Sequence, residues 1–221
     1  MYLAESGGAL SVLNEFHNDA ILCKDKSIHW IFVVSKPVLA ETDNIKVLRY
    51  PWIKKSWFHR LFFDNFVAAK LVRKYDADKI LSLQNITIPY TKIKQDLYVH
   101  NSLPFIDYRF PFKKNKHLWV YQNIIGRSII KSIKNADEVI VQTEWMKKAI
   151  IEIGIVNKNI EVVPPKINLD VKSFFEANKH TLSTFFYPAS AFDYKNHKLI
   201  VEACKILKKN QKKLNIRFYL L

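Results

Sequence analysis

The side chains best suited to chemistry stand where predicted strands end. His100 closes a strand-like run at residues 97–100, and Asn101 follows it. An imidazole in that position can donate a hydrogen bond to a sugar hydroxyl or act on a leaving group. A histidine at a strand end can equally serve the fold alone, so the residue types leave both interpretations open. Thr143 ends another strand-like run, where its hydroxyl can cap the following helix and can also contact a ligand.

Two further segments have the residue types that bind phosphate. Gly7 and Gly8 precede a helical pattern, and a glycine turn there lets backbone N–H groups approach an anion at the positive end of the helix dipole. Ser190 and Lys195 lie between a strand-like run and another helical pattern. A lysine at that place can reach a diphosphate seated over the strand ends. A tight turn and a solvated lysine are the simpler interpretations of the same residues.

The segment of residues 105–116 mixes aromatic and cationic side chains. Rings of this kind can rest at the depth of lipid headgroups while lysines contact phosphates, so we expect a contact with a lipid-linked acceptor or a membrane interface. The alternative is an ordinary loop whose aromatic rings pack inward. The residues expected to form the contact are Phe105, Arg109, Phe110, Phe112, Lys113 and Lys114.

Strand-like and helix-like patterns alternate along residues 9–163, which predicts an α/β fold with a parallel sheet and crossover helices. In such sheets ligands bind at the carboxyl ends of the strands. The predicted strands cover residues 29–35, 46–50, 78–83, 97–100, 138–143 and 160–163, and the predicted helices cover residues 9–22, 57–75, 118–135 and 144–153. Gly154 is expected to end the last of these helices as a C-cap glycine.

The pattern changes after Pro165. A polar stretch at residues 166–182 is expected to be a hinge, and a new strand, helix and strand follow at residues 184–188, 197–209 and 216–221. We therefore predict a Rossmann-like N-terminal domain at residues 1–165 and the first βαβ unit of a second Rossmann-like domain at residues 183–221. Because a sheet of two strands cannot bury both faces, we expect the second domain to be truncated. We also expect the first strand of the N-terminal domain to be incomplete, because a glycine turn that leads into a helix normally follows a strand and only residues 1–3 precede this one.

The composition limits the class of partner and the compartment. The chain has 221 residues, of which 49% are hydrophobic, and a formal net charge of +15. This charge suits a polyanionic partner, although a Lys-rich composition is also typical of AT-rich genomes. The lysines are spread along helical patterns and no nucleic-acid-binding motif is present, so no nucleic-acid partner is expected. Cys23 and Cys204 are expected to be buried free thiols, and the chain is expected to be cytoplasmic.

These segments together resemble the family-4 glycosyltransferases of the GT-B fold, which transfer a sugar from a nucleotide-sugar donor to an acceptor. The stretches "DKILSL", "YVHNSLPF" and "ADEVIVQTEWMKKAI" follow the order and spacing of the strands in the family's N-terminal domain. "IEVVPPKINLD" resembles the family's entry to the hinge. "FFYPASAFDYKNHKLIVEACKIL" resembles the strand, phosphate lysine and helix that open the family's second domain.

The resemblance implies a hexosyltransferase-like enzyme that retains the anomeric configuration. The acceptor, of the surface polysaccharide or lipopolysaccharide type, would be held by the N-terminal domain through residues 105–116, with peripheral contact at the anionic inner face of the plasma membrane. No metal or resident cofactor is expected, since no His/carboxylate cluster appears. The matched positions are His100 as the catalytic residue, Asn101 and Thr143 beside the sugar, and Gly7, Gly8, Ser190 and Lys195 at the donor diphosphate.

The sequence departs from the family pattern at three places. Ala189-Ser190 stands where the family has the Gly-Arg that supplies its usual diphosphate arginine, and Pro165-Lys166 replaces the Asn-Gly of the hinge. The pair of glutamates that holds the donor ribose and sugar would lie beyond Leu221. These departures leave open a second hypothesis, a non-catalytic accessory protein that binds the acceptor and lacks the donor site.

Overall fold

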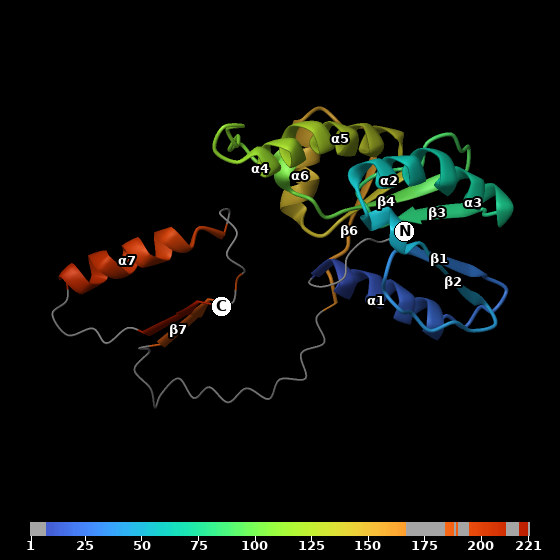
Figure 1. Cartoon of the computed structure of the whole chain (residues 1–221), viewed down its shortest axis with the longest axis horizontal. Helices are drawn as coiled ribbons and strands as arrows, with labels where there is room; N and C mark the ends of the chain where they lie inside the picture. The colour runs from blue at the N-terminus through green and yellow to red at the C-terminus, as the bar shows by residue number, and fades with distance from the viewer. Residues whose placement is uncertain (1–7, 167–183, 188, 190–194, 211–216, 221) are drawn as a thin grey trace. The chain divides into compact units, whose positions relative to one another are not determined.

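The computed structural model describes residues 8–166, 184–187, 189, 195–210 and 217–220 (Figure 1). Contacts divide the chain into two compact units, Met1–Ile167 and Asn168–Leu221. Gly7 and Ser190, both expected at the donor diphosphate, lie outside the described residues.

The first unit contains two sheets in which every neighbouring pair of strands is parallel. One sheet pairs β1 (Trp30–Val34) with β2 (Ile45–Arg49). The other has the order β3-β4-β5-β6, and its strands are β3 (Lys79–Ser82), β4 (Lys94–Val99), β5 (Glu138–Val141) and β6 (Asn159–Val162). β4 lies between two neighbours, and five of its six residues are buried. The predicted α/β class with parallel strands and a Rossmann-like first unit is confirmed.

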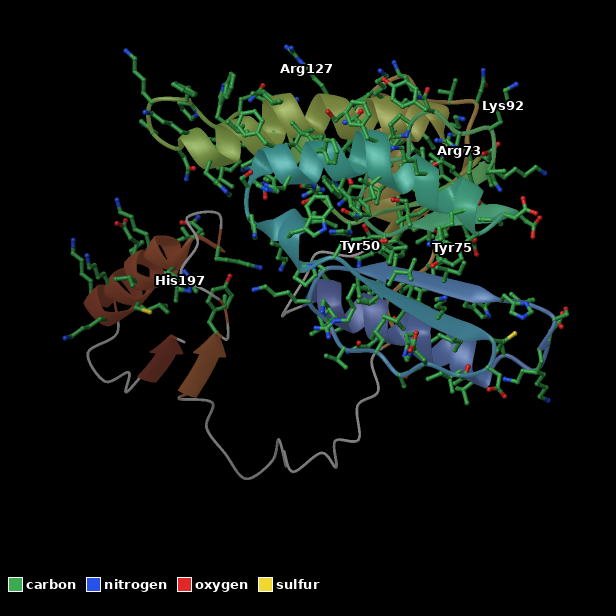
Figure 2. The ribbon with its side chains drawn as sticks, turned by 45° about the vertical axis from the view of Figure 1, so that its right-hand side comes forward. Tyr50, Arg73, Tyr75, Lys92, Arg127 and His197 are labelled. Atoms are coloured by element: carbon green, nitrogen blue, oxygen red, sulfur yellow. The ribbon has the colours of Figure 1, made fainter. Side chains whose placement is uncertain are left out.

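Helices cover both faces of these sheets (Figures 1 and 2). One face is covered by α1 (Gly8–Leu22), and the other by α6 (Glu144–Glu152) and two long helical runs. The first run joins α2 (Trp57–Phe62), the π-helical η2 (Phe63–Val67) and α3 (Ala68–Lys74), and the second joins α4 (Lys116–Val120), the π-helical η4 (Tyr121–Ile125) and α5 (Gly126–Asn135). Short 3-10 helices, η1 (Pro51–Lys54) and η3 (Leu103–Phe105), precede the two runs.

Strand alternation explains why helices are needed on both faces. Tyr98 of β4 packs in the cluster formed with α1, while its neighbours Leu97 and Val99 pack in the cluster that contains Ile129 and Ile133 of α5. The four aliphatic side chains among these are fully enclosed. Burial of each such side chain stabilises the fold by about 1.5–3 kcal/mol, so this central sheet is a rigid support for the loops at its edge.

The described part of the second unit is a single βαβ element. β7 (Thr184–Tyr187) pairs in parallel with β8 (Arg217–Leu220), and α7 (His197–Asn210) joins them. The Tyr187 hydroxyl donates to the Lys195 carbonyl at 3.0 Å, and the Tyr187 ring lies 5.3 Å from the His197 ring. These contacts tie the end of β7 to the start of α7.

The boundaries differ from the sequence prediction mainly at β4, which begins at Lys94 rather than at residue 97. Gly154 follows α6 with φ +91, which confirms its role as a C-cap glycine. Cys23 and Cys204 are free thiols as expected, but both are partly exposed rather than buried. None of the helices in the described part is long and apolar enough to cross a membrane.

Candidate active site

The carboxyl ends of the parallel strands place the predicted site residues of the first unit along one edge. His100 and Asn101 follow β4, and Thr143 follows β5 after a single glutamine. A further residue, Asn85, follows β3, which is the hydrogen-bonded neighbour of β4. This edge is where ligands bind in parallel α/β sheets.

Asn85 connects the ends of β3 and β4. Its Oδ1 accepts hydrogen bonds from the backbone N–H of His100 at 2.7 Å and from that of Asn101 at 3.0 Å. Its side chain is buried, and its φ of +62 lies in the left-handed region, which asparagine tolerates better than most residues. The loop after β4 is therefore held in place by a side chain from the neighbouring strand end.

The same asparagine determines the protonation state of His100. Because Oδ1 accepts two N–H groups, the other amide atom of Asn85 is the NH₂ group, and it lies 3.2 Å from His100 Nε2. An NH₂ group can only donate, so Nε2 accepts and the proton of the neutral imidazole is on Nδ1. Burial lowers the pKa of His100 below its ordinary value of 6.5, which also favours the neutral ring. His100 is thus a neutral hydrogen-bond donor held in a defined orientation.

Asn101 and Thr143 both make local hydrogen bonds. Asn101 Oδ1 accepts from the Leu103 N–H at 3.1 Å, which starts η3. Thr143 Oγ1 accepts from the Met146 N–H at 3.2 Å and confirms the predicted cap of α6. The roles of Asn101 and Thr143 toward a sugar stay predictions.

Tyr98 lies next to these strand ends and carries a polar group into the α1 side of the core. Gln142 Nε2 donates to the Tyr98 hydroxyl at 3.0 Å, and the Tyr98 ring lies 6.3 Å from the His100 ring. Burial raises the pKa of Tyr98 above its ordinary value of 10.0, while the bond from Gln142 opposes this and the charge of Glu15 adds to it. The hydroxyl is therefore neutral and fixes the position of Gln142 directly before Thr143.

The start of α1 is open to approach at the same edge. Gly8 is exposed, and a Cβ added there would meet no heavy atom within 4 Å. An open hollow of about 380 Å³ lies between the first turns of α1 and the segment after β1, lined by Leu10, Asn14, Lys36, Pro37 and Val38. This volume falls within the roughly 300–1,000 Å³ typical of small-molecule sites. The described residues leave room for a side chain at Gly8, so packing does not explain why this residue is a glycine. A ligand that approaches the backbone closely would explain it.

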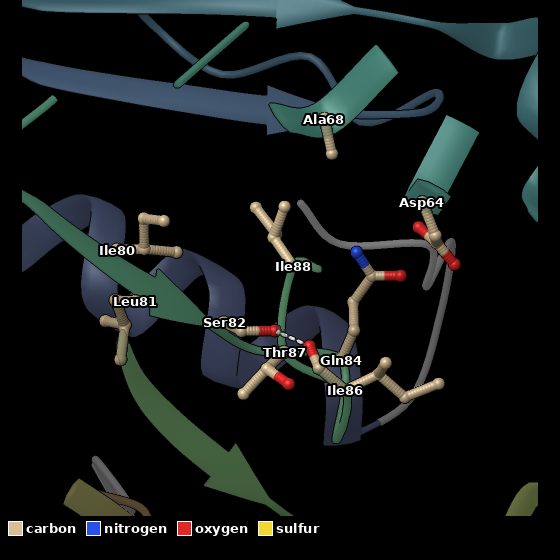
Figure 3. A pocket seen from close by; sticks show the side chains of 9 residues that line it. All are labelled: Asp64, Ala68, Ile80, Leu81, Ser82, Gln84, Ile86, Thr87 and Ile88. Carbon is tan, nitrogen blue, oxygen red and sulfur yellow. Dashed lines mark hydrogen bonds between the residues drawn. The ribbon is translucent and has the colours of Figure 1, made fainter. Parts of the chain in front are cut away.

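A second hollow, beneath the helical run α2–α3, is too small to hold a substrate (Figure 3). Its volume is about 30 Å³, and Gln84 extends into it toward Asp64. Burial raises the pKa of the Asp64 carboxyl, although its ion pair with Arg60 at 3.5 Å opposes this shift. Ser82 Oγ donates to the Ile86 carbonyl at 2.6 Å across the same hollow. These contacts hold the turn after β3, and hence Asn85, in position.

The segment predicted to contact an acceptor is held by one buried glutamine. Gln122, in η4, donates through Nε2 to the Tyr108 carbonyl at 2.7 Å and to the Leu103 carbonyl at 3.1 Å. Its Oε1 accepts from the Phe110 N–H at 3.0 Å. Gly126, one turn later, faces Pro104, and a Cβ added at Gly126 would come within 3.3 Å of that ring. The segment is thus an ordered loop fastened to the second helical run.

The predicted contact residues of this loop fall into two groups. Phe105 is 7% exposed and packs in the main core with α5 and α6, so its side chain supports the fold. Phe110 is half-buried against Tyr108, with ring centroids 4.9 Å apart. Phe112 is 48% exposed and lies edge-on to Trp119, and Lys116 lies over its ring. Three cations reach solvent: Arg109, Lys113 and Lys114.

Lys195, the remaining predicted diphosphate ligand, belongs to the second unit. It is exposed and directly precedes Asn196, whose φ of +52 turns the chain into α7. The lysine therefore stands at the amino end of a helix of 14 residues, next to its free N–H groups. A role in binding phosphate stays a prediction.

Comparison with known families identifies the first unit. A family model described as Glycosyltransferase Family 4 matches residues 27–171, which is more than half of the chain. The chain belongs to this family. The match spans β1 to β6 and includes both Asn85 and His100. A comparison with curated proteins gives no match.

Membership of glycosyltransferase family 4 identifies the general chemistry as glycosyl transfer, with a sugar donor and an acceptor as partners. Sequence reasoning missed two residues of the family-4 domain that matter most for its geometry, Asn85 and Gln122. The only signal for Asn85 was an asparagine just after a strand-like run, a common place for left-handed turns. Gln122 gave no signal, because a glutamine within a helical pattern usually faces solvent.

Proposed function

We propose that this protein transfers a hexose from a nucleotide-sugar donor to a glycan or lipid-linked acceptor of the surface polysaccharide or lipopolysaccharide type. The observation that carries the proposal is the Asn85–His100 pair at the carboxyl edge of the sheet. It holds a neutral imidazole whose proton is on Nδ1, an atom buried at the strand end, and we propose that this N–H is the donor to a hydroxyl of the transferred sugar, which adds no charge.

The transfer breaks the bond between the anomeric carbon and a diphosphate oxygen, forms a bond from that carbon to the oxygen of an acceptor hydroxyl, and passes the hydroxyl proton to the leaving diphosphate. The leaving diphosphate needs positive partners. We propose one candidate for this role in each unit: the N–H groups at the start of α1, beside Gly8, in the first unit, and Lys195 at the start of α7 in the second. We propose that transfer is independent of metal and persists in EDTA, because the sequence shows no His/carboxylate cluster.

The acceptor would be held by the ordered loop of residues 105–116, where Gln122 fixes the backbone and Arg109, Lys113 and Lys114 present positive charge. A phosphate-bearing lipid or glycan suits such a surface.

The experiment that tests this function measures release of nucleoside diphosphate from a panel of UDP- and GDP-sugars, with and without added glycan and lipid-linked acceptors. We expect release from one donor that depends on acceptor and yields a glycosylated product. Acceptor binding without release from any donor would favour the accessory-protein hypothesis instead. Matched reactions with EDTA and with added Mg²⁺ test metal independence separately.

A further inference from the structure

The run α2–η2 carries an apolar face that the described residues leave exposed. We call it the α2 face; its members are Trp57, Phe58, Leu61, Phe62 and Phe66, which are 50%, 83%, 54%, 54% and 57% exposed. Three pairs among them are spaced i, i+4, so the members of each pair are neighbours along the helical run: Trp57 with Leu61, Phe58 with Phe62, and Phe62 with Phe66. Single exposed apolar residues are normal, but a contiguous group of large ones marks an interaction site.

The opposite side of the same run already supplies the contacts with the core. Phe63 is fully enclosed and packs with Ile53 and Ala68 beneath the run. The run is therefore apolar on two sides, one facing the sheet and one facing solvent. Phe62 and Phe66 lie side by side on the outer side, with ring centroids 5.4 Å apart.

The neighbouring helical run extends this apolar surface. The Trp57 ring lies edge-on to Tyr121 of η4, with centroids 6.2 Å apart, so the start of α2 touches the second run. That run and the loop before it expose Ile124, Phe112 and Tyr108 by 55%, 48% and 62%. Aromatic side chains dominate the combined surface, and Trp and Tyr rings favour the headgroup region of bilayers.

The charge of these two segments is almost entirely positive. Residues 51–75 contain six Lys or Arg and one acidic residue, Asp64, which is paired with Arg60. Residues 108–135 contain seven Lys or Arg and no Asp or Glu. Figure 2 shows the helical runs from the side, with Arg127 of α5 extending away from the sheet. A broad apolar surface bordered by cations and nearly free of acids is complementary to an anionic lipid surface rather than to an ordinary protein.

We propose that the α2 face docks on an anionic lipid bilayer, with its aromatic side chains at headgroup depth and the cations of residues 108–135 on lipid phosphates. This surface includes the exposed Phe112 and the cations of the loop of residues 105–116, whose Phe105 is buried and whose Phe110 is half-buried. The inference deepens the proposed function by placing the enzyme where a lipid-linked acceptor is found. It requires no step of sugar transfer, so binding to lipid is measured without donor or acceptor.

The test is sedimentation of the full chain with vesicles of phosphatidylcholine alone and of phosphatidylcholine with phosphatidylglycerol. We expect binding to the anionic vesicles that weakens as salt is raised. The double variant Phe58→Ser, Phe62→Ser should bind about tenfold more weakly or worse, because two exposed rings no longer enter the interface. Lys113→Ser with Lys114→Ser should weaken binding to anionic vesicles alone, by about fivefold for each lysine that lies near the surface.

Matched variants place equal changes elsewhere on the first unit. Leu22→Ser with Val156→Ser removes two exposed apolar side chains, 76% and 65% exposed, outside the α2 face, and should bind as the unchanged protein does. Lys24→Ser with Lys26→Ser is the corresponding control for charge. Equal binding by the Phe58, Phe62 variant and the unchanged protein would overturn the proposal. So would a dimer in light scattering that this variant converts to a monomer while neither protein binds vesicles, because the α2 face would then be a subunit interface.

Discussion

Replacement of Asn85 by aspartate isolates the contact that holds His100 neutral. The aspartate keeps the two bonds accepted from the His100 and Asn101 N–H groups but replaces the NH₂ group that faces Nε2 with a carboxylate oxygen. At about 3.2 Å that oxygen favours an imidazolium, and an opposite charge at this range raises a pKa by about 1–3 units. We therefore expect the pKa of His100, which burial lowers in the unchanged protein, to rise in the variant.

The sign of the effect on stability follows from linkage. In the unchanged protein the folded-state pKa of His100 lies below 6.5, so only the unfolded chain binds the proton just below that pH, and stability falls as the pH drops. In Asn85→Asp the folded state binds the proton more tightly, so stability falls less as the pH drops. The slope of stability against pH that His100 contributes, which approaches about 1.4 kcal/mol per pH unit inside its window in the unchanged protein, therefore decreases in the variant.

The assay is urea unfolding followed by tryptophan fluorescence between about pH 5 and pH 8, with the His100 ring titrated by NMR. All five tryptophans lie in the first unit, so the fluorescence reports on the domain that contains the site. Asn18→Asp, an exposed position on α1, makes the same change of charge and should leave the slope unaltered. Asn85→Ala strands two N–H groups and places alanine at a left-handed φ, which should cost about 2–5 kcal/mol.

An unchanged slope in Asn85→Asp, together with a His100 pKa that does not rise, would refute the assignment of the Asn85 amide and of the imidazole tautomer. A decreased slope that persists when His100 is also replaced by glutamine would assign the effect to another group.

Three further changes test the remaining parts of the site. Gly8→Ala should alter the melting temperature little, because the added Cβ meets nothing within 4 Å, but should slow transfer if a diphosphate approaches this backbone. Thermal unfolding measures the first effect and the transfer assay the second, and an unchanged rate would remove Gly8 from the diphosphate site. Gln122→Leu leaves three backbone partners unsatisfied and should speed hydrogen exchange across residues 103–110, whereas Asn123→Ala, which loses only a bond to the Trp119 carbonyl within the helix, should not. Lys195→Met should weaken binding of a nucleoside diphosphate about tenfold without changing the melting of the first unit, and equal binding would remove Lys195 from the donor site.

The regular elements could be predicted because their apolar patterns are local. β1, α1 and α6 begin and end within about a residue of the expected positions, and the cap residues Thr143 and Gly154 do what their types favour. The early start of β4 could not be predicted, because Gln95 and Asp96 are polar. Both are nevertheless buried: Gln95 bonds the Ile88 backbone in both directions, and Asp96 pairs with Lys79 at 2.6 Å.

The key contacts of the site depend on tertiary structure and so were out of reach of local patterns. Asn85 meets His100 only because β3 and β4 pair in the register that sets Lys79 beside Lys94. The α2 face was missed for a related reason. An apolar helical pattern predicts burial, and only the packing of Phe63 shows which side is already covered.

The rate of sugar transfer by His100→Ala, compared with that by His29→Ala, tests the central claim most directly. His29 is an exposed histidine that precedes β1, so its loss is a matched control at the far end of the strands. If His100 donates to the transferred sugar, the His100 variant should lose about 100-fold or more in rate while it stays folded, and the His29 variant should keep the full rate. Equal rates for the two folded variants would contradict the assignment of this strand end as the site of glycosyl transfer.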